Sequence, residues 1–193
     1  MRPLAARMSR LGTETAFEVL ARARALEAQG RHIVHLEIGE PDFDTPKSVT
    51  AAGVAAIERG ETHYTPSAGI IELRGAIADY LKRTRGLGYD ASQVIVAPGA
   101  KPIMFYAILA LVDHGDEAIY PDPGFPIYAS MIDFAGGVPV PVPLREENDF
   151  VPDLDELRRL VTPKTKLIIL NSPHNPTGGL LSDEAVRDRK SVV

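Results

Sequence analysis

The stretch NSPHNPTGG, residues 171–179, combines side chains that could do chemistry with an unusual backbone. A residue that precedes a proline is biased towards extended backbone, so Pro176 restrains Asn175 at the mouth of the apolar segment before it. An asparagine amide held in this way could donate a hydrogen bond to an oxyanion. His174 stands beside it, and a single histidine is more often a local hydrogen-bonding residue than a base or a metal ligand. Taken alone, such a stretch is more often a proline-rich turn than a site.

Two further loops carry residues that suit a flat or anionic ligand. In PGAKP, Gly99 permits a tight turn, and small Ala100 lets the backbone approach a ligand. Lys101 adds a positive charge to the N-terminus of the helix expected to follow, which is a favourable place for phosphate. In PDPGFPIY, Phe125 lies between a glycine and a proline, a rigid setting that could present its ring. Each of these loops, in isolation, is more often an ordinary structural turn.

Four other residues are weaker candidates. Gly39 in IGEPDF lets backbone approach a ligand, and Tyr64 in HYTPSAGIIELR precedes an expected helix. Asp122 and Tyr128 of the PDPGFPIY stretch stay undecided between structure and function. No HExxH, GxSxG, GxxxxGK[ST] or GxGxxG pattern occurs, so zincins, serine hydrolases and the common nucleotide loops lack support.

The elements that must position these residues follow from hydrophobic periodicity. Helical spacing predicts helices near residues 13–29, 48–59, 70–84, 102–112, 125–135 and 154–161. The last of these begins with Asp153 and Glu156 at capping-box spacing. Short apolar segments predict strands at residues 32–39, 94–97, 117–120, 138–144 and 167–170. Alternating strands and helices indicate an α/β fold with a mainly parallel sheet covered on both faces. Ligands of such sheets bind beyond the carboxyl ends of the strands, where the three loops described above would meet.

Composition excludes several classes of protein. The 193 residues include no cysteine, which removes disulfides, thiolate zinc sites, iron–sulfur clusters and cysteine nucleophiles. The net charge is −5 and the sequence contains no cluster of basic residues, so nucleic acid is not an expected partner. The longest apolar run, residues 103–112, is too short to span a bilayer, and the N-terminus has no apolar targeting segment. We therefore expect a cytoplasmic protein that does not insert into a membrane.

In their order and joint spacing, these stretches resemble class I and II aminotransferases, which are pyridoxal 5′-phosphate (PLP) enzymes of the aspartate aminotransferase fold. The resemblance extends from about Leu11 to Ala185. It implies the three-layer, mainly parallel large domain of PLP fold type I, preceded by an N-terminal segment of the small domain. It also implies transamination between an amino acid and a 2-oxo acid, and a homodimer when the protein is full length.

The resemblance assigns roles to individual residues. It makes the Gly39 loop a contact for the substrate α-carboxylate. It makes Asn175 a donor to the phenolic oxygen of the cofactor, at the edge of the substrate site, and implies a cis bond between Asn175 and Pro176. Tyr64 matches the tyrosine that reaches the cofactor phosphate of the neighbouring subunit.

Two further assignments concern the cofactor's phosphate and ring. Gly99, Ala100 and Lys101 match the phosphate-binding turn of the family. Phe125 occupies the place where aspartate-specific members usually stack a tryptophan on the cofactor ring. A phenylalanine can stack but lacks the indole N–H donor, so the resemblance does not extend to dicarboxylate specificity.

The family's catalytic lysine, which forms a Schiff base with PLP, lies beyond the NPTG motif, and none of the lysines here has its sequence context. We therefore expect no catalytic residue in this chain and a truncated, inactive N-terminal part. The expected segments are an N-terminal arm with a small-domain segment (1–47), a partial PLP-binding large domain (48–187) and a non-native tail (188–193). The tail DRKSVV is what a common sequencing adapter encodes in frame. Two alternatives stay open: a PLP lyase or synthase of the same fold, of the carbon–sulfur lyase type, and a non-catalytic aminotransferase-like regulatory module.

Overall fold

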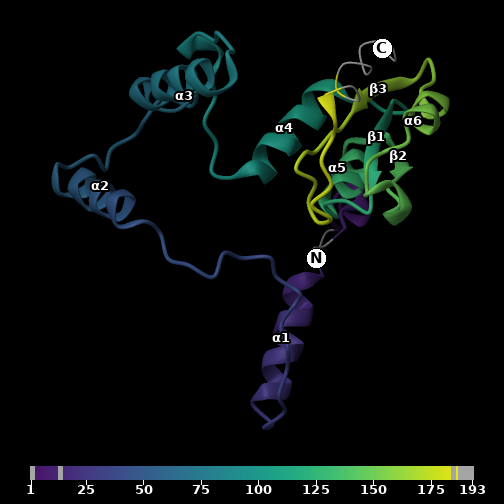
Figure 1. The fold of residues 1–193 in the computed structure, drawn as a ribbon, viewed down its shortest axis with the longest axis horizontal. Coiled ribbons are helices and arrows are strands. Elements are labelled where there is room, and N and C mark those ends of the chain that lie inside the picture. The colour runs from purple at the N-terminus through teal and green to yellow at the C-terminus, as the bar shows by residue number, and fades with distance from the viewer. Residues whose placement is uncertain (1–2, 13–14, 184–185, 187–193) are drawn as a thin grey trace. The chain divides into compact units, whose positions relative to one another are not determined.

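The computed structural model describes residues 3–12, 15–183 and 186 (Figure 1). It divides into two compact units. Met1–Glu18 with Lys101–Val193 forms what we call the sheet unit, and Val19–Ala100 forms the helical unit. The predicted segment limits, 1–47, 48–187 and 188–193, stay predictions, and the last of these segments lies outside the described residues.

A parallel sheet of three strands forms the centre of the sheet unit. Strand β1 (Glu117–Asp122) lies between β2 (Val138–Pro143) and β3 (Thr165–Ile168), giving the order β2-β1-β3. Glu117 is in register with Val138 on one side and with Thr165 on the other. Parallel neighbours need crossover connections, and α5 (Ile127–Ala135) and α6 (Leu154–Leu160) provide them. The α/β fold with a parallel sheet is as predicted.

Both faces of the sheet are covered. Successive residues of β1 point to opposite sides, so neighbouring residues pack into different layers. Ala118 packs with Ile108 of α4 (Ala100–Leu111) and Ile132 of α5 on one face. Ile119 packs with Val142 and Leu157 of α6 on the other. Ala118, Ile119 and Ile132 have no exposed surface at all. Helix, sheet and helix therefore make the three predicted layers.

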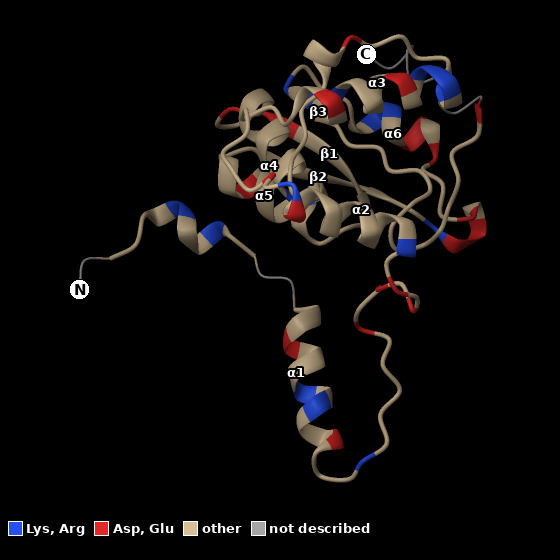
Figure 2. Ribbon diagram, turned by 90° about the vertical axis from the view of Figure 1, so that its left-hand side faces the viewer, with Lys and Arg blue, Asp and Glu red and all other residues tan. Residues whose placement is uncertain are grey.

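The helical unit contains α2 (Lys47–Glu58) and α3 (Ile71–Arg85), and it includes most of α1 (Ala16–Glu27). Gly86 adopts a left-handed conformation, φ 67°, and ends α3, because a residue with a side chain disfavours that backbone. Figure 2 shows charges of both signs along α1. Within the described part of the chain, no helix is long and apolar enough to cross a membrane.

Two predicted strands, residues 32–39 and 94–97, are absent from the described sheet. A strand exists only where a neighbour satisfies its backbone N–H and C=O groups, and neither segment has one. Leu36 is 88 % exposed and Ile95 is 72 % exposed, so these apolar side chains do not face a core here. The second segment is held by isolated bonds: the Val96 N–H donates to the Ala68 carbonyl (3.0 Å), and the Arg74 Nε–H donates to the Val94 carbonyl (2.8 Å).

Candidate active site

The loop that follows β3 is a closed turn that carries Asn175 at its tip. The His174 N–H donates to the Gly179 carbonyl (2.8 Å), and the Gly178 N–H donates back to the His174 carbonyl (2.8 Å). The bond between Asn175 and Pro176 is cis, as the resemblance implied. Asn175 itself is exposed, so the turn presents its amide to solvent.

The His174 side chain contacts another residue of this turn, Thr177. The residue is only 6 % exposed, and its Nδ1 lies 2.8 Å from the Thr177 hydroxyl. Its Nε2 is buried and has no hydrogen-bond partner among the residues that the structure describes. Burial lowers the pKa of the imidazole, so the neutral form is favoured. The prediction of a local hydrogen-bonding role is consistent with this geometry, and the described residues hold no cluster of three or more possible metal ligands.

A pair formed by Tyr128 and Asn171 connects α5 with the same loop. Tyr128 is 5 % exposed, and burial raises the pKa of its phenol, while a hydrogen bond with Asn171 acts in the opposite direction. The ring of Tyr128 also meets the ring of Phe125 edge-on, with 6.0 Å between centroids. Asn171 was not singled out from the sequence, although a polar residue just after an apolar strand is a signal that could have found it.

Phe125 and Lys101 come together in the sheet unit. The Lys101 ammonium nitrogen lies 5.6 Å from the centroid of the Phe125 ring, which is within the range of a cation–π contact. The loop that holds Phe125 is tight, because a Cβ at Gly124 would collide with the Pro121 carbonyl oxygen. The rigid setting predicted for Phe125 is therefore present.

The turn before α4 places a glycine next to a helix N-terminus. Gly99 has a φ of 92°, in the left-handed region, and an added Cβ there would meet no atom within 4 Å. Helix α4 begins at Ala100, and its first N–H groups have no partner within the helix. Lys101 follows directly, so donors and positive charge gather at one helix end.

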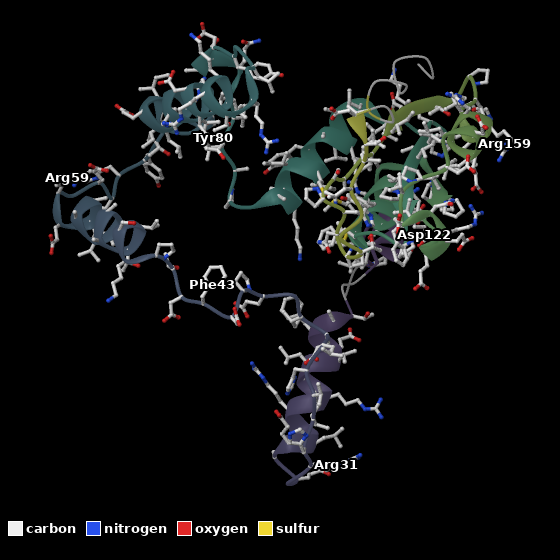
Figure 3. All side chains as sticks on the ribbon, in the orientation of Figure 1. Arg31, Phe43, Arg59, Tyr80, Asp122 and Arg159 are labelled. Carbon is white, nitrogen blue, oxygen red and sulfur yellow. The ribbon has the colours of Figure 1, made fainter. Side chains whose placement is uncertain are left out.

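Asp122 occupies the end of β1 and is exposed; Figure 3 labels it in the sheet unit. Burial raises the pKa of the neighbouring Tyr120 phenol, and the negative charge of Asp122 raises it further. Gly39 and Tyr64 belong to the helical unit, where both are exposed. The structure thus brings Lys101 and Phe125 into contact and links Phe125 to the Asn175 loop through Tyr128 and Asn171. It describes no contact of Gly39 or Tyr64 with these residues.

Comparison with known proteins shows the family of this chain. The family model for aminotransferase class I and II matches residues 31–189. This chain belongs to the class I and II aminotransferase family.

Among the relatives, the aspartate/prephenate aminotransferase of Thermus thermophilus is 42 % identical over 96 % of the chain and 48 % of its own length. The structure of aspartate aminotransferase from Thermus thermophilus with maleate superimposes with a TM-score of 0.94 at 41 % identity, covering 100 % of this chain and 50 % of that one. Alanine aminotransferase from Pyrococcus furiosus gives a TM-score of 0.91 at 33 % identity, covering 96 % of this chain and 48 % of that one. The chain therefore spans about half the length of the aminotransferases it matches.

Proposed function

We propose that this chain is the part of a PLP-dependent aminotransferase that holds the cofactor's phosphate, ring and phenolic oxygen. The whole enzyme would exchange an amino group between an amino acid and a 2-oxo acid. The observation that carries the proposal is the contact between Lys101 and Phe125, linked through Tyr128 and Asn171 to the loop that presents Asn175. Family membership supports the same conclusion.

The residues present fit PLP. The open backbone around Gly99, the first N–H groups of α4 and the Lys101 charge suit a phosphate dianion. The Phe125 ring would stack on a flat heterocycle. The Asn175 amide would donate to an ionised phenolic oxygen, a charge-assisted bond that favours the ionised form. When bound, PLP supplies the electron sink that an amino acid needs to lose its α-proton.

The other roles follow from the resemblance and are part of the proposal. Gly39 would contact the substrate α-carboxylate, and Tyr64 would reach the phosphate of a partner subunit in a homodimer. None of the lysines is assigned as the covalent anchor; they are Lys47, Lys82, Lys101, Lys164, Lys166 and Lys190. By itself the chain would therefore bind PLP without a covalent bond and would not turn over substrate.

The choice of amino acid is a separate question. The relatives reported above act, by their names, on aspartate, prephenate or alanine. Phe125 offers a stacking surface without an indole donor, so it does not by itself select between dicarboxylic and small neutral amino acids. We propose aspartate as the first substrate to test, because it appears in the names of relatives above 40 % identity.

Titration of the purified chain with PLP, followed by absorbance, tests the binding proposal. We expect saturable binding that Asn175→Ala weakens by roughly ten- to 150-fold, which corresponds to about 1.5–3 kcal/mol for a lost charge-assisted bond. Lys164→Gln, at an exposed position of the sheet unit, is the matched control and should bind as the wild type does. Absence of saturation, or equal affinity of wild type and Asn175→Ala, would contradict the proposal.

Transamination itself must be measured on a full-length enzyme that contains this chain. Exchange of an amino group between aspartate and a 2-oxo acid is the expected result. Release of pyruvate and ammonia from a cysteine-type substrate, without a 2-oxo acid acceptor, would instead identify a carbon–sulfur lyase of the same fold.

A further inference from the structure

The turn from His174 to Gly179 is held by four hydrogen bonds, and two of them involve the Thr177 hydroxyl. The His174 and Gly178 N–H groups close the backbone ring. The Gly179 N–H donates to Thr177 Oγ1 (3.3 Å), and the same oxygen lies 2.8 Å from His174 Nδ1. Asn175 makes none of these bonds, and yet its position is fixed by them because it lies inside the ring.

Burial favours the neutral form of His174. Thr177 Oγ1 accepts a hydrogen bond from the Gly179 N–H and lies 2.8 Å from His174 Nδ1. A hydroxyl has one proton and two lone pairs, so either tautomer of a neutral imidazole can make this contact. Protonation would place a charge in a buried site, and burial lowers the pKa of His174 accordingly.

The surroundings of His174 offer no charge that would stabilise an imidazolium. It lines a small cavity with residues of β1, β2 and the loops beside them, and none of these residues is titratable; they are Pro121, Val142, Leu144, Phe150, Val151, Pro152, Ile169, Leu170, Asn171, Gly179 and Leu181. Glu146 and Asp149 line a separate open hollow with Thr177, where their carboxylates are exposed to solvent.

We propose that neutral His174 is a positioning residue, which acts through Thr177 to hold the turn that presents Asn175 to the cofactor. The role of the turn rests on the proposed function, in which Asn175 contacts PLP. The hydrogen-bonded lock itself does not depend on that function. Because neutral imidazole is the locking form, the turn should be tight above the ordinary histidine pKa of 6.5 and should loosen as the pH falls below it.

The test uses the 193-residue chain and the matched pair Thr177→Val and Thr177→Ser, which remove and keep the hydroxyl. Amide hydrogen exchange measured by NMR gives the protection of the Gly178 and Gly179 N–H groups. We expect Thr177→Val to lower this protection, and the affinity for PLP, by roughly five-fold, while Thr177→Ser stays within about two-fold of wild type. Replacement of Thr177 avoids the larger risk to folding that a change of the buried His174 would carry.

A pH series adds a readout that a purely structural role would not move. In wild type, protection at Gly178 and Gly179 should fall between pH 8 and pH 5. His174→Asn keeps a side-chain acceptor near the Nδ1 position but does not titrate, so it should remove this pH dependence. His114→Asn, at an exposed position of the sheet unit, is the control and should retain it.

The outcomes separate the two proposals. Equal protection in wild type and Thr177→Val, or a pH dependence that survives in His174→Asn, would show that His174 does not lock the turn. Lower protection with unchanged PLP affinity would show that the turn does not position Asn175. Failure of the wild-type chain to bind PLP would refute the proposed function, and the protection values would still decide whether the lock exists.

Discussion

Replacement of Gly179 by alanine is the sharpest packing test of the Asn175 loop. A Cβ at this position would lie 2.8 Å from the Phe150 carbonyl oxygen and 2.9 Å from that of Asp149. The first distance is about half an ångström shorter than the 3.4 Å at which ordinary contact begins. Both obstacles are backbone atoms, so no flexible side chain can swing aside.

The carbonyl groups of Asp149 and Phe150 can shift little, because the backbone around them is constrained. Asp149 and Phe150 have φ values of 51° and 54°, in the left-handed region that residues with side chains rarely occupy. Their N–H groups are bound to the carbonyls of Glu146 (3.0 Å) and Arg145 (2.9 Å). Insertion of a methyl group into such a contact costs about 1–3 kcal/mol, and we expect a loss of about 2 kcal/mol in the free energy of unfolding of the sheet unit.

The assay is a urea titration followed by the NMR signals of β1 amides, which report on the sheet unit alone. With a denaturant slope of about 1–3 kcal/mol per molar urea, the expected loss lowers the midpoint by about 1 M. Gly178→Ala is the matched control, because a Cβ there meets nothing within 4 Å and the only penalty is its φ of 78°. That penalty is about 1–2 kcal/mol.

The local response separates the two variants further. Gly179→Ala must move the contact between the loop and residues 149–150, so the amide signals of Asp149 and Phe150 should shift. Gly178→Ala should leave them in place. A midpoint for Gly179→Ala equal to that of wild type, or unshifted signals at these two residues, would refute the packing argument.

Three further changes probe other contacts. Leu157→Ala empties a site that is 2 % exposed and should cost about 2–5 kcal/mol in the same titration, whereas Leu157→Met should cost less than about 1.5 kcal/mol. Hydrogen bonds from His35 to the carboxylates of Glu37 and then Glu27 raise the pKa of the His35 ring. This ionic contact should break as the pH rises through a value above 6.5, which NMR of the His35 ring measures. Backbone N–H groups lower the pKa of Asp153, so its cap on α6 should be intact above the ordinary aspartate pKa of 3.8 and weaken as the pH falls below it. Asp153→Ala should speed amide exchange in the first turn of α6 at neutral pH, and Asp153→Asn should do so less.

The helices could be predicted well because their signals are local. All six expected helices are present, and α3 begins and ends within one residue of the predicted 70–84. Asp153 caps α6 by accepting the N–H groups of Asp155 and Glu156, as the spacing suggested. The reciprocal half of the capping box does not form, because the Glu156 carboxylate binds the Arg145 guanidinium instead. Tertiary contacts of this kind leave no local pattern.

The strands were predicted less completely because a strand depends on its neighbours. The strands near 117–120, 138–144 and 167–170 form because they pair with one another, whereas the apolar segments 32–39 and 94–97 have no partner in the described sheet. A short apolar segment is able to pair. Its sequence does not say which segment it pairs with.

The candidate site shows the same division between local and distant information. Lys101, Phe125 and Asn175 were found by their own sequence context, since glycine permits a tight turn and proline restricts the backbone near each of them. The bond between Tyr128 and Asn171 joins residues 43 positions apart, and no motif encodes it. Thr177 was also missed, because a threonine within NPTG gains its meaning only when the buried His174 ring is seen 2.8 Å away.

The candidate site residues fall into two groups, one in the sheet unit and one in the helical unit. The loops that carry Lys101, Phe125 and Asn175 are organised by hydrogen bonds and ring contacts inside the sheet unit, so they should be formed wherever that unit is folded. Tyr64 is fully exposed in the helical unit, and its assigned role needs a second subunit. In this chain, Asn175→Ala should therefore weaken PLP binding while Tyr64→Phe has no measurable effect. A larger loss from Tyr64→Phe in the same absorbance titration would mean that the helical unit already takes part in binding the cofactor.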